Sequence, residues 1–164
     1  MKATVMVIRQ AKKADIDVLV TLLRSSFRDV AERFEITEEN NPKFLAFCTN
    51  ERIESDLEKD LIYYILEKDG SPYGCVALER AKPGVCYLMR LAVLAGHRGK
   101  GYGKMLVHHI FEKARATGAR RVEIAMISKD TKLKNWYKKL GFIQKSTKKY
   151  DHLPFIVAFM YREL

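Results

Sequence analysis

Glycines and basic side chains alternate in residues 96–104, directly after an apolar run. Glycine permits positive φ angles and lets the backbone approach a ligand closely. Unpaired N–H groups at a helix start carry partial positive charge, which suits a phosphate or pyrophosphate group. These residue types therefore predict an anion site. The residues concerned are Gly96, Arg98, Gly99, Lys100, Gly101, Gly103 and Lys104.

The spacing of these glycines excludes two common phosphate-binding motifs. A P-loop needs Gly-Lys-Ser/Thr after four intervening residues, but here the second glycine, Gly101, is followed by Tyr102. A dinucleotide-binding fingerprint needs a third glycine three positions after the second. If Gly99 and Gly101 are the first two glycines, that position holds Lys104, and if Gly101 and Gly103 are, it holds Leu106. Neither motif therefore fits.

The pattern that does fit is Arg-x-x-Gly-x-Gly over residues 98–103, after a run ending Leu-Ala-Val. It resembles the pyrophosphate-binding signature of the GNAT superfamily of acyl-CoA-dependent N-acyltransferases. Residues 135–142, NWYKKLGF, are similar to the NxxYxKLGF segment of that superfamily. Two such segments in the expected order make the resemblance specific. It covers residues 60–164 closely and the N-terminal third in outline.

The resemblance implies acetyl-CoA as the acyl-donor cosubstrate. Backbone groups before the glycine turn would contact the pantetheine arm in a gap between two splayed parallel strands, and the turn would bind the pyrophosphate. Lys100 and Lys104 would equally suit solvated surface positions, as Asn135 would suit an exposed helix. The residues expected to bind the cofactor are Leu91, Ala92, Val93, Arg98, Gly99, Lys100, Gly101, Tyr102, Gly103, Lys104 and Asn135.

Tyr137 and Glu79 are the candidates for proton transfer. The resemblance implies that Tyr137 is the general acid that protonates the leaving thiolate, and a core aromatic residue is the alternative. GNAT enzymes often carry a Glu general base on the strand before the glycine turn, but this strand offers Met89 and Arg90. Glu79, on the preceding strand, is a substitute base, and a solvent-facing strand residue is the alternative.

The glycine turn must be positioned by the elements around it, which are expected to be a strand before it, a helix after it and then a second strand. Residues 85–93 and 122–127 are apolar, β-prone runs, and the segment between them has apolar residues three and four positions apart. Gly118 is placed to end that helix in a left-handed cap. Such a helix returns the chain to the same end of the sheet, so the two strands should be parallel in a right-handed βαβ unit.

Further strands and helices are expected around this unit. An Asp-Gly turn at Asp69 predicts a hairpin, and Asp130 is a candidate N-cap. The resemblance implies an α/β fold (α+β by some schemes), the GNAT fold, in a single domain over residues 1–164. Its sheet would have about seven strands, mixed but mostly antiparallel, flanked by helices and containing the splayed parallel pair. The additional strands are expected at 4–10, 61–66, 73–79, 142–148 and 154–162, and helices at 16–27, 42–48, 51–59 and 131–140.

Charge is distributed unevenly along the chain. The net charge is +10, of which residues 97–149 carry +12 and the other residues −2. A positive surface there would attract and hold the phosphates of coenzyme A. Residues 29–60 contain ten acidic residues against four basic ones, and we interpret this segment as a candidate wall of a site for a cationic amine. A solvated helix face is an equal alternative.

Several other classes of function are disfavoured. The three cysteines include no CxxC pair, so we expect buried thiols and a cytoplasmic protein. No apolar run is long enough to span a bilayer, the four histidines lack metal-ligand spacing, and the basic residues follow no nucleic-acid-binding motif. We therefore expect no membrane, metal or nucleic-acid partner, and a basic nucleic-acid-binding module is the weaker alternative.

The sequence thus predicts an N-acetyltransferase that moves an acetyl group from acetyl-CoA to a primary amine of a small molecule or peptide. Transfer would occur directly in a ternary complex, without a covalent enzyme intermediate. A GNAT protein that binds acyl-CoA without catalysis is the alternative. The sequence leaves open the acceptor, the acyl-chain length, the general base, the pathway and whether the protein forms a homodimer.

Overall fold

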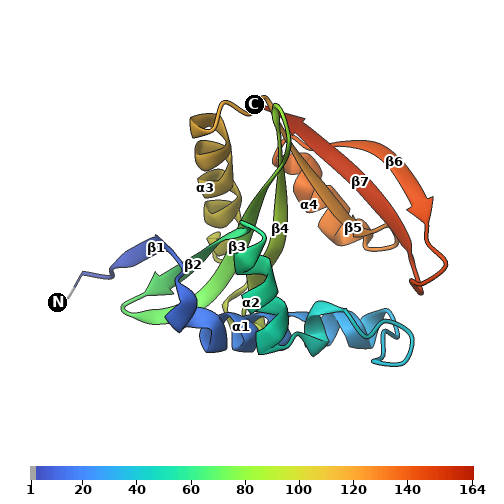
Figure 1. Cartoon of the computed structure of the whole chain (residues 1–164), viewed down its shortest axis with the longest axis horizontal. Coiled ribbons are helices and arrows are strands. Elements are labelled where there is room, and N and C mark those ends of the chain that lie inside the picture. The colour runs from blue at the N-terminus through green and yellow to red at the C-terminus, as the bar shows by residue number, and fades with distance from the viewer. Residues whose placement is uncertain (1–2) are drawn as a thin grey trace.

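A seven-stranded mixed sheet forms the centre of the computed structural model, which describes residues 3–164 (Figure 1). The strand order is β1-β2-β3-β4-β5-β7-β6, and β4 with β5 is the parallel pair among antiparallel neighbours. The predicted GNAT-type mixed sheet with one parallel pair is therefore confirmed. The strands are β1 (Met6–Gln10), β2 (Ile62–Lys68), β3 (Ser71–Lys82), β4 (Val85–Val93), β5 (Arg121–Ile127), β6 (Ile143–Lys149) and β7 (Ile156–Glu163).

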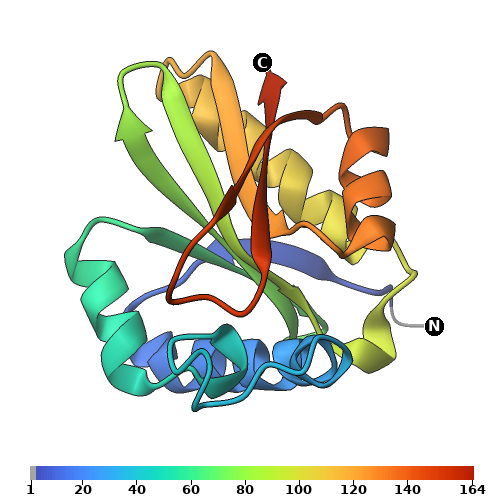
Figure 2. The ribbon, with the colours of Figure 1, turned by 90° about the vertical axis from the view of Figure 1, so that its right-hand side faces the viewer.

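Helices cover both faces of this sheet because alternate strand residues point to opposite sides. Leu66 and Val76 pack on one face with α3, whereas Ile65 and Cys75 pack on the other face with α1 and α2. Figure 2 shows α1 crossing below the sheet and α3 behind it. The helices are α1 (Ile16–Arg33), α2 (Asn50–Glu58), α3 (Tyr102–Ala116) and α4 (Thr131–Lys139), with short 3-10 turns at Lys13–Asp15, Leu45–Phe47 and Ala95–His97.

The sheet opens between β4 and β5. These strands pair only from Val85 with Arg121 to Tyr87 with Glu123. Beyond this point β4 continues along β3, whereas β5 continues along β7, and the two strands diverge (Figure 1). The predicted splayed pair is thus present, and the edge of β4 that faces the opening is free of strand pairing after Tyr87.

Local sequence signals account for most element boundaries. Asp69 and Gly70 both have positive φ, as a two-residue hairpin turn requires. The side chain of Asp130 accepts a hydrogen bond from the N–H of Leu133 and caps α4, and Gly118 has φ +85° after the end of α3. The helix expected at 42–48 is only one 3-10 turn. Within residues 3–164, no helix is long and apolar enough to cross a membrane.

Candidate active site

The glycine turn between β4 and α3 is shaped by backbone conformation. Gly99 and Gly101 have φ of +78° and +85°, and Gly101 is the N-cap of α3. A Cβ atom at either position would meet nothing within 4 Å. The glycines are therefore required by the left-handed backbone, and the space above them is open to a ligand. Lys100 and Lys104 are exposed beside this space.

Gly103 is required for a different reason. A Cβ atom there would lie 3.1 Å from Cζ2 of Trp136, so glycine lets the first turn of α3 pack closely against α4. Tyr102 is buried in the core, whereas Asn135 is exposed on α4. The two motifs predicted from sequence thus contact each other through Gly103 and Trp136.

The side chain of Arg98 binds α1 and the end of β4. Its Nη1 donates to Oδ2 of Asp29 at 2.9 Å, its Nη2 donates to the carbonyl of Ser26, and its Nε donates to the carbonyl of Val93 at 3.1 Å. Burial raises the pKa of Asp29, but hydrogen bonding and attraction to Arg98 outweigh this and leave that pKa below its ordinary value. Arg98 therefore fixes the glycine turn to α1.

The strand residues before the turn present their backbone to the opening. Ala92 is buried, and Leu91 and Val93 are half-buried against the core. Their apolar side chains pack on the two faces of the sheet, Ala92 on one and Leu91 and Val93 on the other. Because β5 has diverged at this level, the main-chain groups that do not pair with β3 face the opening, except the carbonyl of Val93, which binds Arg98.

Tyr137 lies on the face of the sheet that packs against α3. Its ring packs edge-on against Trp136 and Phe142, with centroid distances of 5.0 and 5.3 Å. Burial raises the pKa of its phenol well above the ordinary value of 10. The phenol therefore holds its proton at neutral pH. Figure 1 shows α4, which carries it, beside the opening between β4 and β5.

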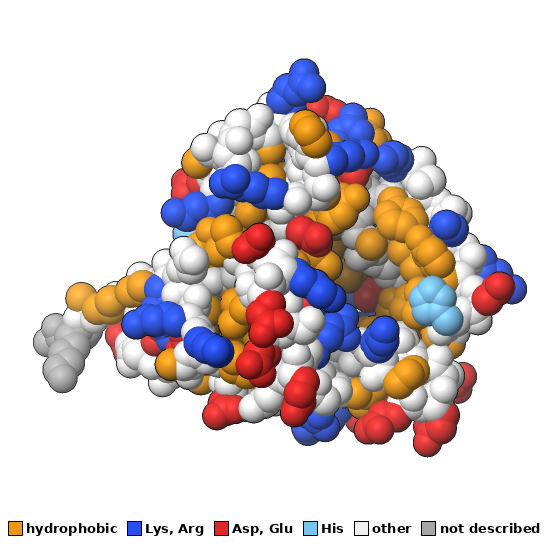
Figure 3. All heavy atoms as spheres, viewed as in Figure 1, with side chains coloured by type: hydrophobic (Ala, Val, Ile, Leu, Met, Phe, Trp, Pro, Cys, Tyr) orange, Lys and Arg blue, Asp and Glu red, His pale blue; other side chains and the backbone are white. Residues whose placement is uncertain are grey.

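A cleft of about 500 Å³ lies on the other side of the parallel pair. Half-buried Glu79 lines it together with Met89, and Glu123 forms an ion pair with Lys145 at 3.0 Å. Figure 3 shows the surface hollowed between the β6–β7 hairpin and the rest of the sheet. The lining residues are Glu79, Lys82, Tyr87, Leu88, Met89, Glu123, Ile124, Ala125, Lys145, Ser146 and Phe159.

Glu123 lines the cleft but is not among the site residues predicted from the sequence. In β5 its neighbours Val122 and Ile124 are buried in the core, so the period of two turns Glu123 to the opposite face. A carboxylate inside an otherwise apolar strand was the signal available. Its exposed side-chain fraction is only 12%, which is low for a charged residue.

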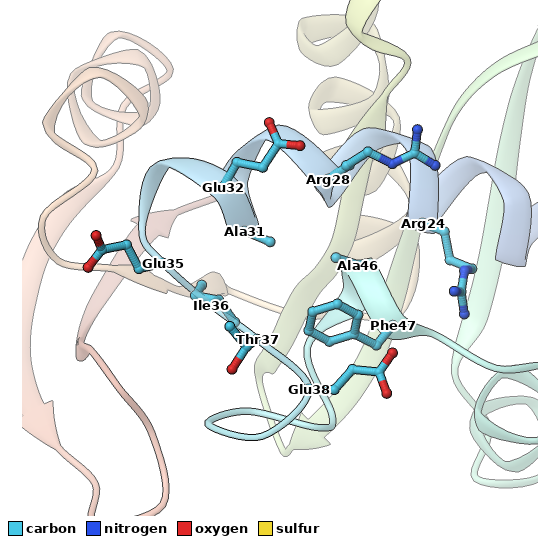
Figure 4. A pocket seen from close by; sticks show the side chains of 10 residues that line it. All are labelled: Arg24, Arg28, Ala31, Glu32, Glu35, Ile36, Thr37, Glu38, Ala46 and Phe47. Atoms are coloured by element: carbon cyan, nitrogen blue, oxygen red, sulfur yellow. The ribbon is translucent and has the colours of Figure 1, made fainter.

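The acidic segment 29–60 lies outside the cleft that contains Glu79 and Glu123. None of its residues is among those that line the cleft. Glu32, Glu35 and Glu38 surround a separate pocket of about 480 Å³ between α1 and the 3-10 turn Leu45–Phe47 (Figure 4). Arg24 and Arg28 lie on the same pocket, so it is not uniformly acidic. Within residues 3–164, no cluster of three or more His, Cys, Asp or Glu side chains is arranged to hold a metal ion.

Residues 19–142 match the family model described as the acetyltransferase (GNAT) family. The chain is 33% identical over 100 residues to an amino-acid acetyltransferase of Ralstonia nicotianae, covering 60% of this chain and 21% of that protein. It is 31% identical over 148 residues to an amino-acid acetyltransferase of Neisseria meningitidis serogroup A, covering 90% and 29% respectively. The chain thus spans less than a third of the length of these relatives.

Two solved structures share this fold. One is N-acetylglutamate synthase from Neisseria gonorrhoeae in complex with coenzyme A and N-acetyl-glutamate; the TM-score is 0.70 and the identity 26%, over 99% of this chain and 36% of that one. The other is yncA from Salmonella typhimurium with its cofactor acetyl-CoA; the TM-score is 0.72 and the identity 17%, over 98% of this chain and 94% of that one.

Proposed function

The chain belongs to the acetyltransferase (GNAT) family, and we propose that it transfers an acetyl group from acetyl-CoA directly to the primary amine of a small molecule or peptide. One observation supports this above all. The sheet opens beyond Tyr87, with the glycine turn at the far end of β4 and a charged cleft beside its start. The opening would let a thioester held from one side meet an amine held on the other.

The residues at the glycine turn fit coenzyme A. The N–H groups in the first turn of α3 have no intrahelical partner, and the open space above Gly99 and Gly101 would admit a pyrophosphate. Lys100 and Lys104 would add charge-assisted contacts. Leu91, Ala92 and Val93 would hydrogen-bond the pantetheine arm through their backbone, and Asn135 would contact it from α4.

The chemistry needs two proton transfers. As the amine nitrogen attacks, a bond forms between nitrogen and the carbonyl carbon, and the carbonyl oxygen gains negative charge. The carbon–sulfur bond then breaks. Glu79 would accept the proton that the amine loses, directly or through water, and Tyr137 would give its phenolic proton to the departing thiolate.

The cleft supports an acceptor that carries a carboxylate beside its amine. Glu79 would attract an ammonium group and Lys82 would attract an acid group, while Glu123 and Lys145 already form an ion pair with each other. The relatives at 31 to 33% identity are named amino-acid acetyltransferases. An amino acid is therefore our proposed acceptor class. The purely cationic acceptor expected from residues 29–60 has less support, because those residues do not line the cleft.

Free-thiol release from acetyl-CoA tests the proposal. A panel of amino acids, polyamines, amino sugars and peptides should give turnover with one or more amino acids and little with amines that lack a carboxylate. Preference for a polyamine would reject the amino-acid assignment. Binding of coenzyme A in calorimetry without turnover on any amine would instead favour the non-catalytic alternative.

A further inference from the structure

Arg90 has an unusual backbone conformation in the middle of β4. Its φ is +56°, in the left-handed region that residues with a side chain rarely adopt. The pairing of β3 with β4 shifts between Cys75 and Ala77, so Arg90 and Leu91 lie opposite a single residue of β3. This is a β-bulge, and it lies where β4 has separated from β5.

Two buried side chains hold Arg90 in place. Its Nε lies 3.2 Å from Oδ2 of Asp56 and 3.2 Å from the hydroxyl of Tyr63, and its Nη2 lies 3.4 Å from Oδ1 of Asp56. The hydroxyl of Tyr63 donates to Oδ2 of Asp56 at 2.5 Å. The network therefore joins the bulge in β4 to α2 and to β2.

The network is enclosed by the surrounding structure. The side chains of Arg90 and Asp56 are only 12% and 7% exposed, and Tyr63 is fully buried. Burial raises the pKa of Tyr63 above its ordinary value, so its hydroxyl stays protonated as a donor. Removing one member would leave the others with unsatisfied buried groups. These contacts therefore resist movement of the backbone at Arg90.

We propose that Asp56, Tyr63 and Arg90 are positioning residues that orient the β4 bulge so that a backbone N–H there donates to the carbonyl oxygen of the bound thioester. The inference rests on the proposed function. A bulge interrupts the regular hydrogen bonding between two paired strands, so a peptide group of β4 at the bulge need not bond to β3. The other edge of β4 faces the opening. Because an oxyanion donor acts only if it is fixed in advance, a rigid anchor has a catalytic use.

The test uses acetyl-CoA labelled with ¹³C at the carbonyl, because this probe needs no knowledge of the acceptor. Isotope-edited infrared spectra should show the carbonyl stretch of the bound thioester at lower wavenumber than in free acetyl-CoA, since hydrogen bonding weakens the double bond. Tyr63→Phe and Asp56→Asn should each lose about half or more of this shift, with about threefold or smaller change in Kd for acetyl-CoA. If either variant fails to fold, Arg90→Lys, which keeps the charge, replaces it in this test.

Tyr64→Phe is the matched control. Tyr64 is the next residue of β2, is also buried, and faces the opposite side of the sheet against His109. This variant should keep the full carbonyl shift. If Tyr63→Phe and Asp56→Asn bind acetyl-CoA with an unchanged band and lose only melting temperature, the network is structural and the inference is overturned. A wild-type protein that binds acetyl-CoA without a shift also overturns it, whereas no binding at all rejects the proposed function itself.

Discussion

Tyr137 and Glu79 lie on opposite faces of the open sheet, which suits their proposed roles. Tyr137 packs with the core under α3, whereas Glu79 points into the cleft because its neighbour Leu78 fills that core. In the proposed reaction the thiolate would leave on the face of Tyr137 and the amine would arrive on the face of Glu79, so the acid and the base would not exchange protons with each other. At the scale of single residues, the proposed mechanism would place one proton transfer on each face of the sheet.

Tyr137→Phe should lower kcat by about 10- to 100-fold, because the thiolate would leave without a proton donor. The KM for acetyl-CoA should change little, since the ring and its packing remain. Burial raises the pKa of Tyr137, so the wild type should show no loss of activity from its ionisation up to pH 10. Steady-state thiol release measures both effects. Tyr150→Phe, in the β6–β7 loop, is the control, and an equal loss there would contradict the assignment.

Glu79→Gln should reduce kcat/KM by about 100-fold at neutral pH, because the amide cannot accept the proton of the amine. Raising the pH should recover part of this loss as more of the amine becomes neutral in solution. Rates measured across a pH series test this, with Glu54→Gln on the exposed side of α2 as control. If Glu123→Gln shows the larger loss and Glu79→Gln is active, the base is Glu123 instead.

At the scale of elements, the glycine turn is held in place by contacts with α1 and α4. Arg98 ties the turn to α1, and Gly103 allows α3 to pack on Trp136. The ion pair of Arg98 with Asp29 is about 40% exposed on each side, so it contributes little energy by itself. Its value lies in fixing the geometry of the turn.

Gly101→Ala should weaken coenzyme A binding about 10-fold and cost about 1 kcal/mol of stability, because alanine is strained at φ +85°. Gly96→Ala is the matched control. A Cβ atom at either position meets nothing within 4 Å, but Gly96 does not have positive φ. Calorimetry and thermal unfolding of both variants make the comparison. Similar behaviour of the two would show that backbone conformation at Gly101 is not what shapes the site.

At the scale of the whole molecule, positive charge gathers in the half that contains the glycine turn. Residues 97–149 carry a net charge of +12, whereas all other residues together carry −2, and the basic segment includes α3 and α4. Charges spread over a surface attract an anionic ligand before any contact forms. The charge distribution is therefore expected to favour coenzyme A, which carries several phosphate charges.

Raising the ionic strength from about 0.05 to 0.5 M should increase the Kd for coenzyme A by about 10-fold, because salt screens exposed charges. Pantetheine, which has no phosphate, is the control ligand and should bind with little salt dependence. Calorimetric titrations at several salt concentrations separate the two. Equal salt dependence of both ligands would show that the basic half does not act through the phosphates.

Features that depend on neighbours along the chain could be predicted from the sequence alone. The apolar period of α3, the cap at Asp130, the Asp69-Gly70 turn and the left-handed Gly118 follow from a few adjacent residues each. The order of strand, glycine turn and helix also fixed the parallel pair, because a crossover helix of this length leaves little choice of direction. The resemblance added the splayed pair and the sheet of seven strands.

Contacts between side chains that are distant in the sequence became visible only in the folded chain. Arg98 reaches Asp29 across 69 positions, and Arg90 reaches Asp56 across 34. Glu79 and Glu123 share a cleft although they lie on strands separated by α3. Such pairs depend on register, and a shift of one residue turns every side chain of a strand to the other face. The bulge at Arg90 produces such a shift in register between β3 and β4. Because contacts with the distant residues Asp56 and Tyr63 hold the bulge, local sequence patterns did not predict it.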